Sequence, residues 1–376
     1  MRTDRDHRIT NLASVWVVFL MVLTACVTTT HSSPLPTTQT VMRIGAYKQI
    51  VLPNGYGWES PSISVYFTDP TSPFAYEKTD GIEQFLAKSI DSAKVSVDMA
   101  IYNLDNYSIQ KALIDAYNRG VTVRIVSEQD NKDTYSIIRL QNAGIPIVFD
   151  QSTGLMHNKF VIIDGVQVWT GSANFSDNSF FQDRNNMIHI TSRDLAMNYE
   201  QEFKEMFSQG IFGWAGKIGN PRSIAFVDGT QIETYFSPDD EPAKRIVEIL
   251  RNSQKSIYFF NYSLTGVDFS DALIQARSRG VIVSGYLDDN LSRSKGSEMT
   301  RLIENGIKVG IDDKTGLLHH KVFIIDQQIV ILGSYNFSAN AEKRNDENIL
   351  IIHDPSLAEL FTLEYQKLEA LFPLEQ

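Results

Sequence analysis

Hydrophobic and polar positions along the chain repeat one local pattern, in which an amphipathic helix ends at a glycine and an apolar strand follows. Residues 112–126 have this pattern, with helical spacing up to Gly120 and β-branched side chains after it. Residues 272–283 repeat it at a constant offset (272 − 112 = 160). Shorter units of the same kind follow at residues 140–149 and 302–311. The pattern therefore predicts a tandem repeat.

Strands that alternate with helices of this size are typical of an α/β fold. The repeat predicts two similar lobes, each a mixed, largely parallel sheet flanked by helices. Residues 160–163 and 322–325 are continuous apolar runs of the kind that forms a buried strand. We predict a first lobe at residues 63–210, a glycine-rich inter-lobe linker at residues 211–230, and a second lobe at residues 231–376.

Residues 1–25 have the pattern of a signal peptide. Basic residues at the start precede an apolar run at residues 15–23, and small residues then lead to Cys26. This arrangement resembles the lipobox of bacterial lipoproteins, and the resemblance implies cleavage before Cys26 and lipid attachment to it. An uncleaved anchor, or a secretory signal with an incidental cysteine, is the alternative.

Residues 26–62 are predicted to form a tether and lead-in to the first lobe. Residues 27–40 are rich in Thr, Ser and Pro and are too polar to bury a core. We therefore expect an extracytoplasmic protein of a bacterial cell envelope, held at a membrane by a lipid on Cys26.

The composition and charge of the chain limit the kinds of molecule that it is expected to bind. The chain has 376 residues, 43% of them hydrophobic, which is enough for two lobes that each bury a core. Its formal net charge of −11 offers no broad basic surface for a polyanion, although a local basic cleft is compatible with that average. The single cysteine excludes a disulfide within the chain.

One block of polar residues occurs twice, around the two apolar strands. In each copy His-x-Lys is followed by four residues, an Asp, six residues and Gly-Ser-x-Asn-Phe-Ser, and the copies are separated by a constant offset (319 − 157 = 162). The members are His157, Lys159, Asp164, Ser172 and Asn174 in the first copy and His319, Lys321, Asp326, Ser334 and Asn336 in the second. So specific a set is not expected to recur by accident.

These residue types suit chemistry on phosphorus. Alternation along a strand places the His and Lys of each block on one face, while Asn158 and His320 point to the other. A neutral imidazole attacks phosphorus, and ammonium, hydroxyl and amide donors stabilise the phosphate oxygens. A second, protonated imidazole donates to the leaving oxygen, and no metal or cofactor is needed. Asp164 and Asp326 are counted with the blocks, although an Asp at the end of a strand most often caps a turn.

The two blocks resemble the signature of the phospholipase D superfamily, H-x-K-x4-D with a trailing G-S-x-N, over residues 63–376. The resemblance implies one active site at the interface of two α/β lobes, a phosphohistidine intermediate, metal-independent phosphodiester cleavage, and a monomer with both lobes in one chain. It implies that His157 attacks phosphorus and that His319 protonates the leaving alcohol. The residues that it places on the phosphate oxygens are Lys159, Lys321, Asn174 and Asn336.

The two copies differ in one acidic residue. Members of the superfamily usually carry a carboxylate shortly after G-S-x-N that orients a histidine, and the second copy has it at Glu347. The alignment places Asn185 opposite Glu347 (347 − 162 = 185), so the first copy lacks this carboxylate unless Asp183 replaces it. Our hypothesis is that Glu347 supports His157 across the lobe interface, and its pairing with His319 in its own lobe is the alternative.

The substrate is less strongly indicated than the chemistry. A lipid-anchored protein is held next to phospholipid, and an acidic chain is poorly suited to long polyanions, so we favour phospholipase D-like hydrolysis of phospholipid. The alternative is an extracytoplasmic endonuclease or nucleotide phosphodiesterase that uses the same two histidines. A third interpretation, a catalytically decayed envelope binding protein, is disfavoured because His and Lys are intact in both copies.

Overall fold

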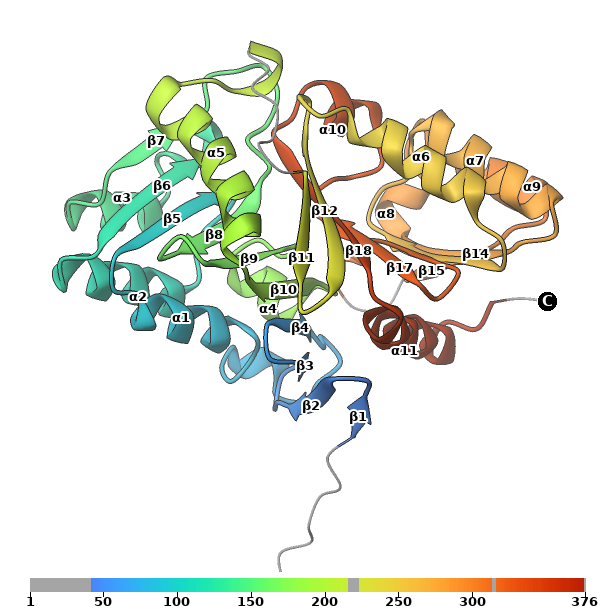
Figure 1. Ribbon diagram of the computed structural model, residues 1–376, viewed down its shortest axis with the longest axis horizontal. Helices are drawn as coiled ribbons and strands as arrows, with labels where there is room; N and C mark the ends of the chain where they lie inside the picture. Colours follow the sequence, from blue (N-terminus) through green and yellow to red (C-terminus); the bar gives the residue numbers. More distant parts are fainter. Residues whose placement is uncertain (1–41, 216–222, 313–315, 375–376) are drawn as a thin grey trace, which may run out of the picture. The chain divides into compact units, whose positions relative to one another are not determined.

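The computed structural model describes residues 42–215, 223–312 and 316–374, and Figure 1 shows their helices and strands. The predicted signal peptide, Cys26 and the predicted tether up to residue 41 lie outside these ranges. The described chain forms two α/β lobes in sequence order.

The first lobe is built on a sheet that has ten strands among the described residues. In spatial order they are β1 (Arg43–Ile44), β2 (Tyr47–Val51), β3 (Tyr56–Glu59), β4 (Ile63–Phe67), β10 (Asn186–Thr191), β9 (Gln167–Gly171), β8 (Lys159–Ile163), β5 (Ser96–Ile101), β6 (Thr122–Ser127) and β7 (Ile147–Phe149). The α-helices of this lobe are α1 (Glu83–Ser92), α2 (Tyr107–Asn118), α3 (Tyr135–Asn142), α4 (Asp177–Phe181) and α5 (Arg193–Gln209).

The second lobe has a sheet of eight described strands. In spatial order they are β11 (Ile224–Val227), β12 (Thr230–Ser237), β18 (Glu347–His353), β17 (Ile329–Gly333), β16 (Lys321–Ile325), β13 (Ser256–Asn261), β14 (Ile282–Asp288) and β15 (Lys308–Asp312). Its α-helices are α6 (Pro242–Asn252), α7 (Val267–Ser278), α8 (Asp289–Ser292), α9 (Met299–Glu304), α10 (Ala339–Lys343) and α11 (Pro355–Leu371). Short 3₁₀ helices lie at Ala75–Glu77, Gln129–Asn131 and Gly213–Ala215.

The two halves of the sequence repeat fold with the same strand order. The strand order β4-β10-β9-β8-β5-β6-β7 of the first sheet returns in the second as β12-β18-β17-β16-β13-β14-β15. The two predicted apolar strands are β8 and β16, and every residue of both is buried. The predicted fold of two similar α/β lobes is therefore confirmed.

The expectation of largely parallel sheets is wrong in its detail. Parallel pairing joins β5, β6 and β7 in the first sheet and β13, β14 and β15 in the second. The strands that carry the His-x-Lys blocks run antiparallel to both of their neighbours. The reason is local, because β8 and β9 are joined by a turn of three residues, 164–166, and so short a connection allows only antiparallel pairing.

The two sheets also begin earlier than the boundaries that we expected. Strands β1 to β3 add to β4 by antiparallel pairing, so the first sheet starts at Arg43 and not at residue 63. Strand β11 pairs with β12 inside the segment that we expected to be the inter-lobe linker. These added strands lack the helix–glycine–strand pattern by which the repeat is recognised.

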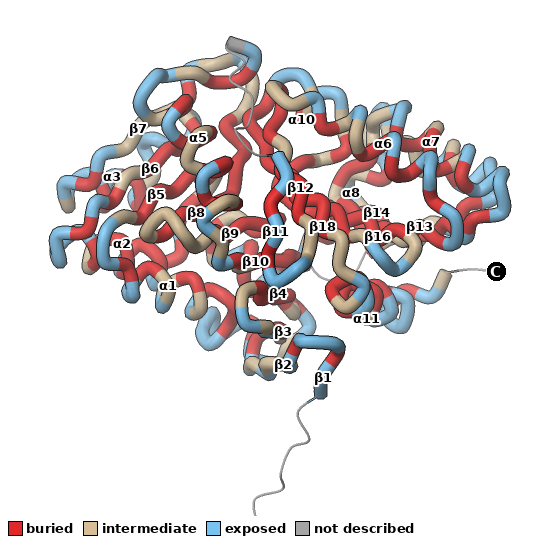
Figure 2. The backbone as a smooth tube through the Cα atoms, in the orientation of Figure 1, coloured by how far each residue is buried: buried red, intermediate tan, exposed pale blue. Residues whose placement is uncertain are grey.

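A hydrophobic cluster contains residues of both lobes and packs them against each other. Phe160 of β8 and Tyr199 of α5 both contact Phe236 of β12 through their rings. In the same cluster Phe67 of β4 packs edge-on against Phe361 of α11, with ring centroids 5.0 Å apart. Figure 2 shows the buried backbone running through the centre of the molecule. Each lobe has one further hydrophobic cluster of its own.

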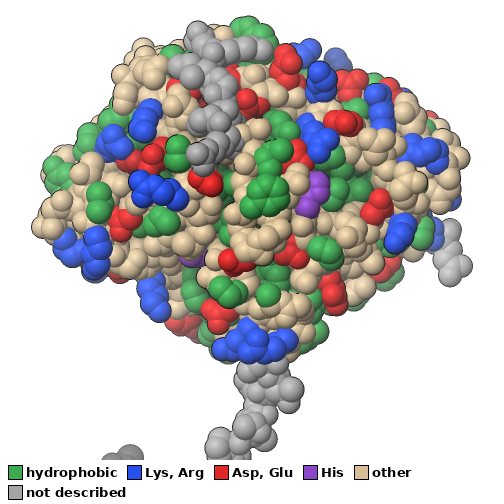
Figure 3. All heavy atoms as spheres, in the orientation of Figure 1, with side chains coloured by type: hydrophobic (Ala, Val, Ile, Leu, Met, Phe, Trp, Pro, Cys, Tyr) green, Lys and Arg blue, Asp and Glu red, His purple; other side chains and the backbone are tan. Residues whose placement is uncertain are grey.

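The surface carries charges of both signs. Figure 3 shows basic and acidic side chains interspersed over the face turned to the viewer, with apolar side chains between them. In the part of the chain that the structure describes, no helix is long and apolar enough to cross a membrane.

Candidate active site

The segments that lead into β8 and β16 are each bound to the opposite lobe. The backbone N–H of His157 donates to the carbonyl oxygen of Asp346 at 3.0 Å, and the N–H of His319 donates to the carbonyl oxygen of Arg184 at 2.9 Å. Both contacts belong to short bridges between the lobes. Hydrogen bonds across the lobe interface therefore fix the backbone that carries each of the two imidazoles.

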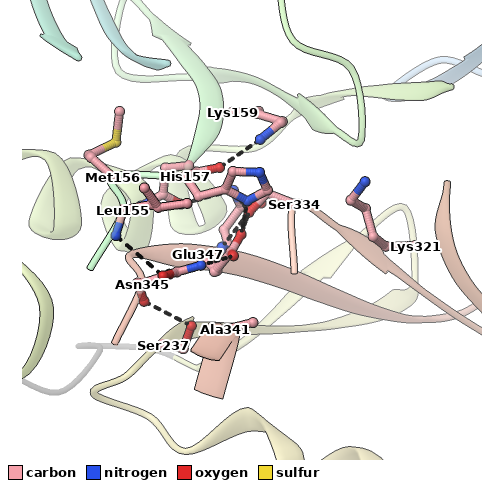
Figure 4. Close-up of polar contacts among 12 residues, drawn as sticks. Leu155, Met156, His157, Lys159, Ser237, Lys321, Ser334, Ala341, Asn345 and Glu347 are labelled. Carbon is pink, nitrogen blue, oxygen red and sulfur yellow. Dashed lines mark hydrogen bonds and ion pairs between the residues drawn. The ribbon is translucent and has the colours of Figure 1, made fainter. Parts of the chain in front are cut away.

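The imidazole of His157 has a carboxylate partner. Its Nδ1 lies 2.7 Å from Oε2 of Glu347 in the second lobe. Glu347 is fully buried and also accepts hydrogen bonds from the Ser334 hydroxyl at 2.7 Å and from the Asn345 amide at 3.1 Å. Figure 4 shows the ring of His157 between Glu347 and the side chain of Lys159. This is the cross-lobe pairing that we expected.

The imidazole of His319 has a neutral partner at the matching position. Its Nδ1 lies 2.9 Å from Oδ1 of Asn185 in the first lobe. The Asn185 amide donates to the carbonyl oxygen of Ser179 at 2.9 Å, which fixes the Oδ1 atom toward His319. Nδ1 of His319 therefore carries the hydrogen, and its Nε2 is left for the substrate.

The two partners affect the imidazoles differently. Burial lowers the pKa of His157, and Glu347 opposes this shift. Burial lowers the pKa of His319 well below its ordinary value, and the nearby cationic groups of Lys321, Lys159 and His157 lower it further. In the unliganded site His319 is therefore a neutral imidazole at neutral pH. Burial alone would raise the pKa of Glu347, but the charge and hydrogen bond of His157 and the charge of Lys159 keep it below its ordinary value.

Both lysines of the blocks are buried beside the imidazoles. The ammonium of Lys159 donates to the carbonyl oxygen of His157 at 2.9 Å, and that of Lys321 to the carbonyl oxygen of His319 at 2.6 Å. Burial lowers the pKa of Lys159 to about 7, against an opposing effect of Glu347. It lowers the pKa of Lys321 well below the ordinary value, with Lys159 adding to the shift.

The serines of the blocks differ from their predicted role as phosphate donors. The Ser172 hydroxyl donates to Oδ1 of Asn185 at 2.9 Å, as the Ser334 hydroxyl donates to Glu347. Each hydroxyl also accepts a backbone N–H, from Asn186 at 3.0 Å and from Asn348 at 3.1 Å. Since each hydroxyl proton is already used, the serines orient the partners of the histidines.

The asparagines of the blocks have no such ties to the protein. Asn174 and Asn336 are half-buried, and their buried Oδ1 atoms accept no hydrogen bond among the described residues. Their role on phosphate oxygens remains a prediction.

The two aspartates of the blocks are structural, which corrects their place among the catalytic residues. Asp164 accepts the backbone N–H groups of residues 94–96 at 2.7–3.1 Å, and Asp326 accepts those of residues 254–256 at 2.6–3.1 Å. Burial raises the pKa of Asp164, but these hydrogen bonds outweigh it and lower the pKa. Both residues lie at the end of their strand away from the lysine, so they fix a turn.

Two further residues near the blocks, Asp183 and His320, make contacts away from the two catalytic imidazoles. Asp183, which we considered as a replacement carboxylate, accepts the backbone N–H of Leu317 at 3.0 Å, and Asn185 takes the place beside His319. His320 points to the other face of β16, where its Nδ1 lies 3.1 Å from the Asn186 amide.

Sequence reasoning missed two tyrosines that pack on the imidazoles. The ring of Tyr102 contacts His157 with centroids 5.1 Å apart, and that of Tyr262 contacts His319 at 4.9 Å. Their shared position directly after a central strand, at the offset of the helix repeat (262 − 102 = 160), was the signal available in the sequence.

Among the described residues, no group of three or more His, Cys, Asp or Glu side chains is arranged to hold a metal ion. Within the described part of the chain, the arrangement instead offers two imidazoles whose Nε2 atoms make no hydrogen bond to the protein, two ammonium groups, and two amides whose oxygens accept none. This is a set that can attack a phosphodiester, neutralise its oxygens and protonate its leaving group.

Comparisons with known proteins agree with this chemistry. The model of the family described as "Cardiolipin synthase, PLD-like domain" matches residues 86–207 and again 246–368, once in each lobe. A phospholipase D of Rickettsia prowazekii is 39% identical over 159 residues, which cover 42% of this chain and 78% of the relative. A mitochondrial cardiolipin hydrolase of Chlamydomonas reinhardtii is 26% identical over 182 residues, covering 42% of this chain and 82% of the relative.

A solved structure extends the likeness to both lobes. The phosphatidylserine synthase of Haemophilus influenzae matches 78% of this chain and 85% of its own with a TM-score of 0.61, at 13% identity, which shows a shared fold. The family model covers both lobes and the R. prowazekii relative is matched over most of its length. The chain therefore belongs to the family of cardiolipin synthase-like PLD domains within the phospholipase D superfamily, and it is a phospholipase D-like phosphodiesterase.

Proposed function

We propose that the protein hydrolyses the headgroup phosphodiester of a phospholipid, without a metal, through a phosphohistidine on His157. The observation that carries the assignment of roles is the difference between the two Nδ1 partners, a carboxylate at His157 and an amide at His319. A carboxylate stabilises an imidazole that becomes cationic during the reaction.

In the first step Nε2 of His157 forms a bond to phosphorus and the bond from phosphorus to the leaving alcohol breaks. The leaving oxygen takes the proton from Nε2 of His319. The phosphorylated ring of His157 is cationic, and Glu347 balances that charge through Nδ1–H at 2.7 Å. His319 is neutral in the unliganded site, so the bound phosphodiester anion supplies the negative charge that lets it hold this proton.

In the second step the neutral His319 removes a proton from water. The water oxygen bonds to phosphorus, the N–P bond to His157 breaks, and the phosphate monoester leaves. His319 ends protonated, as it began the cycle. Lys159 and Lys321 hold the non-bridging oxygens in both steps, because their ammonium groups lie beside the two imidazoles.

Phospholipid is the substrate that the relatives and the charge of the chain favour. Relatives named phospholipase D and cardiolipin hydrolase share the domain. The chain carries a net charge of −11, which disfavours long polyanions. We further propose that a lipid on Cys26 holds the protein at a membrane of the bacterial envelope, and that one chain, with both lobes, is the functional unit.

The test compares substrates in excess chelator. Purified protein is assayed with vesicles of phosphatidylcholine or cardiolipin and with single-stranded DNA and RNA, and the double variant His157→Ala/His319→Ala serves as blank. The proposal expects headgroup release that chelator leaves unchanged. Cleavage of nucleic acid alone would favour the nuclease alternative, and activity that is lost with chelator and restored by zinc or magnesium would refute the metal-independent mechanism.

A further inference from the structure

Two tyrosines outside the His-x-Lys blocks occupy equivalent places in the two halves of the site. Tyr102 directly follows β5 and Tyr262 directly follows β13. Their backbone N–H groups donate to the carbonyl oxygens of the middle residues of the blocks, Asn158 at 3.2 Å and His320 at 2.7 Å. This pairing continues the strand ladder and fixes each ring beside its block.

Each tyrosine ring faces an ammonium group. The Nζ atom of Lys159 lies 5.3 Å from the ring centroid of Tyr102, and that of Lys321 lies 4.9 Å from the ring centroid of Tyr262. Both separations are within the range of a cation–π interaction. The same rings also contact His157 and His319, so each tyrosine touches the complete His-Lys pair of its lobe.

The lysines need such a partner because they are buried without a dedicated counter-ion. Neither side chain makes an ion pair within 4.0 Å among the described residues, and each donates a hydrogen bond to a neutral backbone carbonyl. Glu347, which favours the charged form of both lysines, already binds His157, Ser334 and an asparagine. Burying an unpaired ammonium strongly favours its neutral form.

We propose that Tyr102 and Tyr262 are positioning residues whose ring faces stabilise the charged form of the two buried lysines in the unliganded site. A ring face attracts a cation through its quadrupole and carries no net charge. It therefore stabilises each ammonium without neutralising it, and the positive charge stays available for the phosphodiester. A carboxylate in the same place would compete with the substrate.

The ring face, and not the hydroxyl, is the active feature. Burial raises the pKa of Tyr102 and of Tyr262, with nearby carboxylates adding to both shifts, so neither hydroxyl is a source of negative charge. The other charged group that acts on Lys159 is Glu347, which favours its charged form. Lys159 in turn lowers the pKa of Lys321 and of His319. All of these groups are retained when a tyrosine is replaced.

The test measures the titration of Lys159 in the unliganded protein by NMR of lysine labelled at the ε-carbon. The Lys159 signal is assigned by its absence from Lys159→Arg. Tyr102→Leu should lower the titration midpoint by about one pH unit, since a desolvated cation–π contact corresponds to roughly a tenfold change in protonation. Tyr102→Phe, which keeps the ring, should leave the midpoint in place, as should Tyr135→Leu at a tyrosine that is 81% exposed.

Two further variants protect the test against a folding defect. A fluorinated phenylalanine at position 102 keeps the shape of the ring and removes the negative charge of its face, so it should act like Leu. Tyr262→Leu should likewise lower the titration midpoint of Lys321. The proposal is overturned if Leu or the fluorinated ring leaves the midpoint where Phe does. It rests on the proposed function only for its role in catalysis, and the titration is independent of any substrate.

Discussion

The two halves of the site share one backbone and differ in the partner of their histidine. In both, a Ser hydroxyl accepts the N–H of a following residue and donates to the side chain that holds Nδ1 of the opposite lobe's imidazole. That side chain is Glu347 for His157 and Asn185 for His319. The repeat has thus kept the geometry and changed one functional group, so that His157 has a carboxylate that can balance a positive charge on its ring and His319 has a neutral amide.

The largest effect is expected from removing either imidazole, which tests whether the halves form one site. His157→Ala and His319→Ala should each abolish turnover of a natural phosphodiester, because one half lacks the nucleophile and the other the acid. Thermal unfolding should change little. Substantial turnover in either variant would mean that one half works alone.

A smaller but still large effect is expected from the carboxylate. Glu347→Gln keeps the shape of the side chain and removes the charge that balances the phosphorylated ring of His157. We expect kcat to fall by about 10²–10⁴-fold, as for carboxylates that hold catalytic imidazoles elsewhere. Steady-state kinetics measures this, and a fall of less than tenfold would show that Glu347 only shapes the site.

The reverse substitution tests the other half. Asn185→Asp places a carboxylate beside His319 and should raise the pKa of that imidazole, so the protonated acid persists to higher pH. The alkaline limb of the kcat/KM profile should move up by about one to two pH units. An unchanged limb would contradict the role of His319 as the acid. Because the Asn185 amide donates to the carbonyl oxygen of Ser179, some loss of stability is expected as a side effect.

The smallest effect on activity is expected from the two aspartates, which fix a turn in each half. Asp164 and Asp326 each hold three backbone N–H groups at a turn. Asp164→Ala and Asp326→Ala should each lower the free energy of unfolding by about 1–3 kcal/mol, since a charged acceptor is lost, and should leave kcat within a few-fold. Denaturant unfolding and kinetics check this. A fall in kcat like that of Glu347→Gln would restore these residues to the catalytic set.

The features that the sequence could predict are those that depend on residues close together in the chain. Apolar runs and glycine caps identified the lobes, and the spacing of the blocks identified the residues of the site, because both are local signals. The pairing of β1 to β3 with β4 left no repeat to recognise, and antiparallel pairing of β8 depends on a short turn rather than on periodicity.

Which hydrogen bond each polar group makes is not a local signal. Ser172 and Ser334 were expected at the phosphate because a hydroxyl is a donor there, but their protons are given to Asn185 and Glu347. The prediction that these serines donate hydrogen bonds in the site was correct, but the predicted acceptor, a phosphate oxygen, was wrong. Tyr102 was missed because its contact with Lys159 depends on packing across the sheet.

The most direct test of the central claim is to trap the covalent intermediate. The substrate is a phosphodiester with a nitrophenolate leaving group, which departs without needing a proton. The His319→Ala variant should therefore still form the intermediate, but it lacks the base that activates water in the second step. After an alkaline quench, peptide mass spectrometry should find the phosphoryl group, with its remaining ester, on His157. Phosphate on His319 in the reciprocal variant His157→Ala, with none on His157 in His319→Ala, would contradict the account.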